Sequence, residues 1–595
     1  MSVFYVTNQQ KNQEDILKAI NSANYNSIYN AEYLKNSNIS FGYLNDVHQN
    51  SSSQFFVFNN FTILFVGKVY NIFDIKHELE LKGHYFEKET DSEIIVKGFS
   101  EWDTNVFSKL NGDFSFVIYD EYSDKITCVR DRLGVKPLYF CWKNGDFEIC
   151  SLLRPLIDSQ SKICNDALSF YMDCGYVPSP FSIIEDIHKL SSGKYLEIDL
   201  KSKDIKILEY WNLKKVEQTK IPYKQAKEQL HSLLKDAVKI RMTDNQAWSL
   251  SGGTDSALIT SIASTLTERA INTFTIAKEL KYDESIIAAK YAEILKTNHT
   301  KTVCSASDVL QMLPYFIKVY DEPFADSSAL PSLLNNSIIK QHSNFVMSGD
   351  GGDECFLGYS YLDRIKKFLL LKVIPYKLRL LISKLPLHRL LRKDTSSFKN
   401  ILSIKNVNEW ILCIFIGYDT LQKNRNTKFI EYYDNFSTFS ANPFQKAADL
   451  NIKLWLENDS NVKVDRAGMA FDMKVSSPFL DYRIVEFARN LPVDYRYRKN
   501  EKKYILRDIL SEYIPKEVFN QPKRGFTIPI SKWIREDLKE QILLELNDDF
   551  FQKLNNFDVA KFKKQLNEHL SGKFDYSVNI WRIFILAKWY KEFKF

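Results

Sequence analysis

Residues 251–256 read Ser-Gly-Gly-Thr-Asp-Ser, and this run decides the fold of the second half of the chain. It follows a strand-like segment, 247–250, and precedes the apolar stretch 257–266, which is typical of a buried helix. A glycine-rich turn between a strand and a helix directs backbone N–H groups and the positive end of the helix dipole toward one point. The sequence therefore predicts a phosphate site in an α/β domain.

The same turn narrows the kind of phosphate chemistry that is expected. It lacks the lysine of a Walker loop, whose pattern is G-x-x-x-x-G-K-[ST]. A nucleotide bound here should therefore present its pyrophosphate rather than lose its terminal phosphoryl group. A chance turn is the alternative, and the strand and helix placed correctly on either side argue against it.

The composition is that of an ordinary enzyme with more than one domain. Its 595 residues are 45% hydrophobic and 26% charged, with a formal net charge of only +6. No segment reaches the roughly 18 apolar residues of a membrane span, and the start of the chain lacks the charged and apolar regions of a secretory signal. We therefore expect a cytoplasmic protein with neither a nucleic-acid nor a membrane partner.

Two further patterns exclude other kinds of site. The eight Cys include no C-x-x-C pair and the nine His no H-E-x-x-H, so neither a zinc site nor a disulfide framework is indicated. Basic residues are dispersed except over 366–393, where Lys and Arg alternate with Leu and Ile. An amphipathic helical face is the favoured interpretation of that stretch, over a nucleic-acid or membrane patch.

A change of pattern near residue 212 divides the chain into expected domains 1–212 and 213–595. Before it, short β-rich runs alternate with turns, which predicts stacked antiparallel sheets. After it, helical patterns dominate and strands occur singly, which predicts a parallel α/β sheet with a helical carboxy-terminal part. The predicted strands are 54–65, 113–120, 126–130, 137–142, 147–152 and 195–198 in the first part, and 273–277 and 345–348 in the second.

A second glycine-rich turn, Ser348-Gly-Asp-Gly-Gly-Asp-Glu354, follows the strand-like 345–347. Asp350, Asp353 and Glu354 should emerge at the end of a strand, where α/β sheets bind ligands. Carboxylates beside a phosphate suit Mg²⁺, which prefers one or two carboxylates together with phosphate oxygens and water. The alternative is an acidic turn without a metal.

Two polar loops complete the candidate site. The stretch 321–328 is predicted as a loop between helices. Lys523 lies in a loop, 521–526, that is interrupted by Pro and Gly. This lysine is either an ordinary surface residue or a cation that neutralises charge in a phosphoryl or acyl transition state.

Together these stretches resemble the asparagine synthetase family of the bacterial, glutamine-dependent type, over nearly the whole chain. The resemblance implies an N-terminal nucleophile hydrolase-like αββα sandwich followed by an ATP pyrophosphatase domain. Members of the family activate a carboxylate with ATP to an acyl-adenylate, release pyrophosphate and let an amine displace AMP. The likeness rests on 111–120 and 130–139 in the first half, and on 251–256, 274–276, 282–285, 321–331, 348–354, 463–466, 478–481, 523–529 and Trp533 in the second.

The resemblance also implies a role for each matching position, with ATP and Mg²⁺ as cofactors. It is compatible with a homodimer. Asp350 matches the acidic position linked to forming or consuming the adenylate, and Lys523 matches the lysine that stabilises the transition state. Pyrophosphate would be cradled by Ser251, Gly252, Gly253 and Ser256, the adenosine held by Leu250, Ile276, Ser348 and Gly349, and Mg²⁺ shared by Asp255 and Asp353.

The first half departs from the family where glutamine hydrolysis takes place. That reaction needs a cysteine directly after the initiator methionine, and this chain has Ser2. The Asn-Gly of the oxyanion hole is Val66-Gly67, which removes an amide donor. The segment 42–48 lacks the glutamine-binding arginine, so that only Asp91 and its neighbours remain. We predict a degenerate glutaminase half, with Ser2 as a weaker nucleophile as the alternative.

The predicted activity is therefore amide formation from a carboxylate and ammonia or another amine. One alternative is a macrolactam cyclase of the lasso-peptide or β-lactam kind, whose members also lack the glutaminase cysteine. The stretches 321–331 and 523–533 look more like the amidotransferases proper. A second alternative is a silent, nucleotide-binding regulatory paralogue, which is disfavoured because every phosphate and metal position is present.

One departure in the second half concerns the acid that is activated. Before 478–481 the family has Glu-Val-Arg and one more residue, whereas this chain reads Lys474-Val-Ser-Ser477. An arginine can hold a carboxylate or phosphate bidentately and a serine cannot. The sequence thus favours a larger acid, such as a uronic acid on a sugar nucleotide or a peptide side chain, over aspartate. In the alternative, Lys474 or a nearby arginine replaces the contact.

Overall fold

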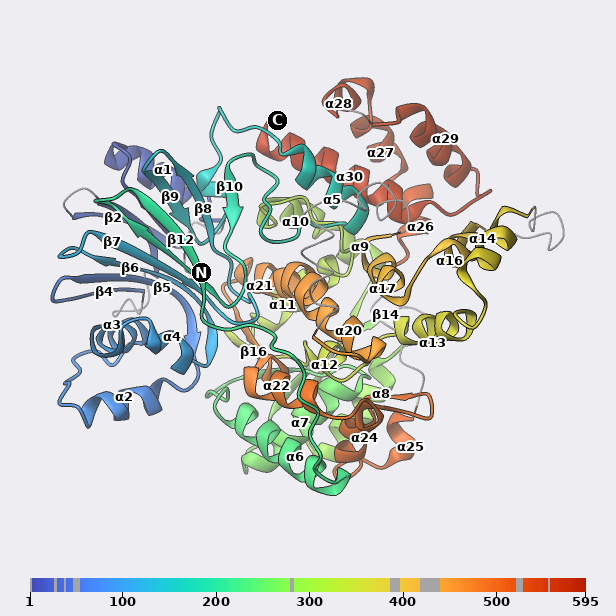
Figure 1. Cartoon of the computed structure of the whole chain (residues 1–595), viewed down its shortest axis with the longest axis horizontal. Coiled ribbons are helices and arrows are strands. Elements are labelled where there is room, and N and C mark those ends of the chain that lie inside the picture. Colours follow the sequence, from blue (N-terminus) through green and yellow to red (C-terminus); the bar gives the residue numbers. More distant parts are fainter. Residues whose placement is uncertain are drawn as a thin grey trace.

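A computed structural model describes residues 3–25, 29–36, 39–46, 54–278, 283–385, 396–417, 439–520, 528–554 and 557–595. A β-rich amino-terminal half packs beside a larger, mainly helical half (Figure 1). The predicted boundary at residue 212 lies between the last strand of the first half, β12 (Asp204–Glu209), and helix α6 (Tyr223–Lys239).

Two six-stranded antiparallel sheets form the amino-terminal half. Their strands are β1 (Phe4–Thr7), β2 (Tyr29–Asn36), β3 (Ile39–Asp46), β4 (Phe55–Phe58), β5 (Phe61–Val69), β6 (Gly112–Asp120), β7 (Lys125–Arg130), β8 (Tyr139–Lys143), β9 (Asp146–Cys150), β10 (Ile187–Lys189), β11 (Lys194–Asp199) and β12. One sheet has the order β10-β8-β9-β1-β3-β2 and the other β12-β11-β7-β6-β5-β4. Between them lies an apolar core that includes Phe4, Phe41, Val117 and Phe140, as expected for stacked sheets. The predicted stack of antiparallel sheets is confirmed.

Helices cover the outer faces of this stack and give it four layers. Helices α2 (Ile72–Glu80), α3 (Asp91–Trp102) and α4 (Asn105–Lys109) pack on the second sheet, with Ile94 and Phe107 against Phe65 and Phe116. Helix α1 (Gln13–Asn21) packs against β2 and β3 on the other side. The αββα sandwich that the resemblance implied is therefore present.

The predicted single strand over 54–65 is wrong, because the structure places a hairpin there. Strands β4 and β5 pair antiparallel, with Phe58 opposite Phe61. The turn passes through Asn59, whose φ of 53° is left-handed. Asn adopts the left-handed conformation more readily than other non-glycine residues, so this turn needs neither Gly nor Pro. The sequence therefore shows no Gly or Pro turn signal between the two strands.

A five-stranded parallel sheet forms the centre of the carboxy-terminal half. Its strands are β13 (Ala247–Ser249), β14 (Asn272–Lys278), β15 (Asn298–Cys304), β16 (Phe345–Met347) and β17 (Lys474–Ser476), in the order β15-β14-β13-β16-β17. The chain thus builds outward from β13 through β14 to β15 on one side, and through β16 to β17 on the other. Ligands bind in such sheets outside the carboxyl ends of the strands where the order reverses, which here means β13 and β16. The strands predicted within 273–277 and 345–348 are confirmed.

Helices surround this sheet and extend into the carboxy-terminal part. Trp248 and Leu250 lie in a core with Ile262, Ile484 and Ile509, contributed by helices on one face of the sheet. The helices of this half include α7 (Thr254–Leu266), α8 (Ser285–Leu295), α10 (Leu313–Val319), α11 (Ala329–Ile339), α12 (Gly352–Cys355), α13 (Tyr361–Leu371), α14 (Tyr376–Lys384), α16 (Ser396–Ser403), α17 (Val407–Ile416), α20 (Pro443–Leu450), α21 (Asn461–Met469), α22 (Tyr482–Asn490), α24 (Tyr504–Leu510), α25 (Lys516–Phe519), α26 (Ile530–Arg535), α27 (Lys539–Glu545), α28 (Asp548–Gln552), α29 (Val559–Leu570) and α30 (Ser577–Phe593).

Buried polar contacts join the two halves. Arg130 of β7 lies 3.3 Å from Glu457, which belongs to a π-helical segment over Asn451–Ser460. The Asn111 amide donates to Asp481 at 2.9 Å. Because unpaired buried charges are costly, these contacts strongly favour one relative placement of the halves. None of the described helices combines the length and the apolar character that a membrane span requires.

Candidate active site

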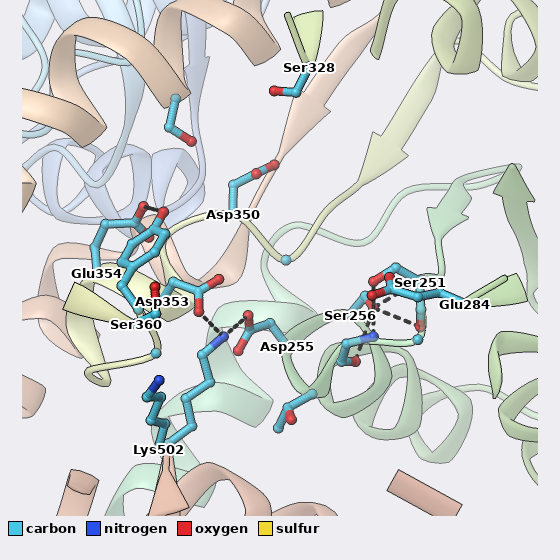
Figure 2. Close-up of a pocket in the computed structure, with 18 of the residues that line it drawn as sticks. Ser251, Asp255, Ser256, Glu284, Ser328, Asp350, Asp353, Glu354, Ser360 and Lys502 are labelled. Carbon is cyan, nitrogen blue, oxygen red and sulfur yellow. Dashed lines mark hydrogen bonds and ion pairs between the residues drawn. The ribbon is translucent and has the colours of Figure 1, made fainter. Parts of the chain in front are cut away.

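A cavity of about 1610 Å³ opens where the strand order of the parallel sheet reverses. Both predicted glycine-rich turns line it, one after β13 and the other after β16. Figure 2 shows Ser251 and Ser256 on one side of the site, Asp353 on the other, and Asp255 and Asp350 between them. The structure thus brings together two stretches that the sequence identified separately.

The first turn is closed by its own serines. The N–H of Ser251 donates to the Ser256 hydroxyl at 3.0 Å, and the N–H of Gly253 donates to the Ser251 hydroxyl at 3.2 Å. The two hydroxyl oxygens are 2.9 Å apart. Helix α7 begins directly after Gly253 and runs for 13 residues, so its positive end faces the cavity. The turn, with Gly252 partly exposed in the cavity wall, has the form of an anion site.

The second turn packs so closely on α7 that a Cβ atom at either of two glycine positions would force a neighbouring group to move. A Cβ atom on Gly349 would lie 2.8 Å from the backbone nitrogen of Ser256. A Cβ on Gly352 would lie 2.6 Å from the carboxylate of Asp255. Absence of side chains here lets the two turns approach until Asp255 and Asp353 face each other.

A buried lysine joins these two carboxylates. The Lys503 ammonium lies 2.6 Å from Asp353 and also forms an ion pair with Asp255. A side chain at Gly358 would collide with both Asp353 and Lys503. The site therefore places one cation between the two residues that the resemblance assigns to Mg²⁺.

Lys503 belongs to a cationic hairpin that the sequence did not reveal. Strands β18 (Tyr497–Arg498) and β19 (Glu501–Lys502) form the hairpin, and Lys499, Lys502 and Lys503 line the cavity. The backbone is left-handed at Lys499, Asn500 and Lys503, with φ of 50°, 69° and 54°. Non-glycine residues in this conformation are costly and concentrate at functional sites. The available sequence signal was the basic cluster over 499–503.

Acidic groups beyond this pair have distinct partners. The Tyr359 hydroxyl donates to Glu354 at 2.6 Å. Burial, and then the negative charge of Asp353, raise the pKa of Glu354 to about 7. The backbone carbonyl of Asp350 accepts a hydrogen bond from Ser477 at 2.6 Å, while Asp350 itself lines the cavity.

The loop over 321–328 connects α10 and α11, as predicted, and contributes a further ion pair to the cavity wall. The Lys463 ammonium of α21 is 3.1 Å from both Asp326 and the Ser328 hydroxyl. Burial lowers the pKa of Lys463, but the charges of Asp326 and Asp459 outweigh burial, so that its pKa is raised overall. Asp321 has a structural role instead, since it is buried 3.0 Å from Arg466.

Some predicted site residues lie elsewhere. The cavity wall includes Ser348 and Gly349, but not Leu250 or Ile276. Leu250 is buried in the core of the sheet, and its N–H donates to the carbonyl of Phe274 at 2.9 Å. The adenosine role of Leu250 and Ile276 stays a prediction. Lys523 and Ser2 lie outside the described residues.

In the amino-terminal half, the predicted glutaminase positions adjoin one strand. Val66 is buried in the core between the sheets, and Gly67 follows it in β5 with a φ of 127°. Asp91, at the start of α3, pairs with Lys68 at 3.1 Å. The Asp91 carboxylate is therefore already paired with a cation from β5.

Comparisons with known proteins agree with both halves. The chain matches the family described as asparagine synthase over residues 229–591, and the family described as glutamine amidotransferase domain over 43–211. It is 26% identical to asparagine synthetase (glutamine-hydrolyzing) 1 of Bacillus subtilis, over 98% of this chain and 94% of that protein. It is also 26% identical to asparagine synthetase (glutamine-hydrolyzing) 3 of the same organism, over 82% of this chain and 81% of that protein.

A solved structure of a glutamine phosphoribosylpyrophosphate amidotransferase from B. subtilis is similar at 13% identity and a TM-score of 0.27, over 51% of this chain and 65% of that one. At this score the likeness carries no argument. The match over 229–591 is different, because it spans more than half of the chain and contains both glycine turns, Lys463 and the cationic hairpin. The chain belongs to the asparagine synthase family.

Proposed function

We propose that this protein adenylates a carboxylate with ATP, releases pyrophosphate and then transfers ammonia or another amine to the acyl group with release of AMP. The observation that carries the proposal is the meeting of two glycine turns at the reversal of the parallel sheet, with Asp255 and Asp353 facing each other there. An anion site beside two carboxylates suits a magnesium-bound pyrophosphate.

The donor set fits Mg²⁺, with ATP as the other cofactor. Asp255 and Asp353 both reach a single ammonium group, so they are close enough to share one cation. Two carboxylates leave the remaining positions of an octahedral ion to phosphate oxygens and water. When bound, Mg²⁺ would neutralise charge on the pyrophosphate. Among the described residues no cluster of three or more His, Cys, Asp and Glu offers a competing metal site.

In this proposal different residues bind the pyrophosphate, balance its charge and act at the acyl group. The backbone of Gly252 and Gly253 and the start of α7 bind the pyrophosphate. The ammonium of Lys503 leaves its place between the carboxylates and pairs with a phosphate oxygen, which keeps a buried cation paired. Asp350 and Lys523 act at the reacting acyl group, where Lys523 offsets the charge that grows in the transition state.

Free ammonia or an amine, rather than glutamine, is the proposed nitrogen source. Three features of the amino-terminal half support this: Ser2 in place of cysteine, Val66 in the apolar core, and the ion pair between Lys68 and Asp91. An oxyanion hole without its amide donor loses much of its stabilising effect.

A carboxylate larger than aspartate is the proposed substrate. Ser476 stands where the family has an arginine, and its hydroxyl faces the sulfur of Met347 at 3.6 Å. Lys474 is no replacement, since its ammonium lies over the ring of Phe345 at 5.8 Å and it does not line the cavity. Lys499, Lys502 and Lys516 add positive charge to the wall, which suits an acid with phosphate groups of its own.

ATP–pyrophosphate exchange with a panel of acids tests the proposal. The panel holds aspartate, free uronic acids, uronic acids on sugar nucleotides and acidic peptides. Exchange that depends on one of these acids supports an adenylating ligase. A macrolactam cyclase would exchange only with its own peptide, and a regulatory paralogue would exchange with none of them.

A further inference from the structure

Helices α13 and α14 form a projection at the edge of the molecule, away from the two sheets of the amino-terminal half (Figure 1). Five large aliphatic side chains of this projection are exposed, and three of them strongly: Leu370 at 75%, Val373 at 84% and Leu381 at 61%. The other two are Leu378 and Leu385. We call these five residues the aliphatic patch.

The inner side of the projection is firmly packed, so the patch is not an unfinished core. Phe368 of α13 stacks on Trp410 of α17 with ring centroids 5.5 Å apart. The buried guanidinium of Arg379 in α14 donates to the carbonyl of Ile404 at 2.9 Å. These contacts fix both helices, and the aliphatic patch remains on their outer side. Large apolar side chains that are exposed together on one projection are typical of a surface that binds a partner.

Positive charge surrounds the patch. The described residues from Arg364 to Leu385 contain seven Lys and Arg and no Asp or Glu. These seven charges exceed the formal net charge of +6, so the rest of the chain is net negative. Five of these cations are exposed among the aliphatic residues: Arg364, Lys367, Lys372, Lys377 and Lys384.

One kind of partner satisfies both properties. A second copy docked through the same surface would bring like charges together, which is unfavourable. A nucleic acid would use the cations but would leave the aliphatic side chains without a partner. An anionic bilayer takes up aliphatic side chains at the boundary of headgroups and acyl chains, and its phosphates pair with Lys and Arg.

We propose that the α13–α14 projection binds the surface of a membrane that contains anionic phospholipid, with the aliphatic patch inserted between the headgroups. This binding is separate from the proposed ligase chemistry, and it revises the expectation of a solvated face without a membrane partner. Interfacial helices of this kind lie on a bilayer and do not cross it.

Vesicle flotation with the full chain tests the proposal. Vesicles of phosphatidylcholine alone are compared with vesicles containing one quarter phosphatidylglycerol, at about 0.15 M salt. We expect binding to the anionic vesicles only. Val373→Glu with Leu381→Glu should lower the partition coefficient roughly tenfold or more. Lys372→Glu with Lys377→Glu should lower it by roughly twentyfivefold or more, since each cation contributes about fivefold near such a surface.

Leu544→Glu is the matched control, because Leu544 of α27 is 70% exposed and lies outside the patch. It should leave binding unchanged. Absence of binding to anionic vesicles overturns the proposal, and so does equal loss in the control. The same holds if sedimentation equilibrium shows a dimer that the patch variants dissociate, or if they lower the melting temperature by more than a few degrees, which would show that the chain itself covers the patch.

Discussion

Gly67 lies near the end of strand β5 in the first half, and Gly352 begins helix α12 after strand β16 in the second half. Each lies beside a predicted active site. At both positions a Cβ atom would come too close to a neighbouring group. A Cβ at Gly67 would collide with the carbonyl oxygen of Asp113, and one at Gly352 would lie 2.6 Å from the Asp255 carboxylate. What differs is the chemistry of their neighbours.

Around Gly352 the side chains are charged and line a cavity. Asp255, Asp353 and Lys503 meet there at the wall of a large cavity. Around Gly67 they are apolar or already paired, with Val66 in the core and Lys68 bound to Asp91. A glycine at such a position reflects the space that the fold leaves for a side chain, and it says nothing about the chemistry of the site. Whether a site can react is read from the side chains beside it.

The largest expected effect concerns the carboxylates of the second half. Asp255→Asn and Asp353→Asn should each lower ATP–pyrophosphate exchange about a thousandfold or more, because the Mg²⁺ on the pyrophosphate loses an anionic ligand. Either change leaves Lys503 one carboxylate partner, so the fold should persist, as a melting curve would show. Asp548→Asn, at an exposed position, is the control. Full exchange in both site variants would mean that the acidic turns are only structural.

The corresponding test in the first half uses glutamine as nitrogen donor. Product formation with glutamine should be at least a hundredfold slower than with ammonium, since an oxyanion donor alone contributes about a hundredfold to a thousandfold. Ser2→Cys alone should not restore it, because Val66 still supplies no donor. Glutamate release at the rate of AMP formation, followed by coupled assay, would show that the first half is active.

Some features of the candidate site could be predicted from the sequence and others could not. The glycine turns and the flanking strands carry local signals, so both turns were placed correctly, as was the loop over 321–328. The ion pair of Lys503 with Asp255 joins residues 248 positions apart. No local pattern encodes such a contact, and only the packing of the β18–β19 hairpin on the two turns creates it. The hairpin over β4 and β5 was missed for another reason, since Asn59 replaces the usual glycine.

Lys523 provides the next test, on the kinetic side. If its ammonium acts on charge that develops in the transition state, Lys523→Ala should lower kcat roughly a hundredfold or more and change the KM for ATP little. Lys532→Ala is a suitable control, because Lys532 of α26 is 65% exposed and pairs with Glu536 directly after the helix. A raised KM with an unchanged kcat would assign Lys523 to ATP binding instead.

Gly67 can be examined through stability. Gly67→Ala should lower the free energy of unfolding by about 3 kcal/mol, from a left-handed backbone together with the clash against Asp113. Gly83→Ala separates the two causes, since Gly83 has a φ of 90° but nothing lies within 4 Å of an added Cβ. That control should cost about 1 kcal/mol. If urea unfolding gives the same loss of free energy of unfolding for both variants, no clash exists at Gly67. The steric argument for Gly67 would then fail.

The smallest expected effect concerns the acid that the second half activates. A hydrogen bond to a charged group contributes about 1.5–3 kcal/mol, so the serine at 476 should weaken the hold on a small carboxylate by roughly tenfold to a hundredfold. Aspartate should therefore be a poor substrate, while an acid with a larger anionic part can gain contacts with Lys499 and Lys502 in the cavity wall. Initial rates of AMP formation with ammonium and each acid measure this directly. Steady asparagine formation with a KM for aspartate below about 1 mM, the upper end of the usual range, would show that another group replaces the arginine. The second half would then be an ordinary ammonia-using synthetase. The chain would depart from its family only in the loss of glutamine hydrolysis in the first half.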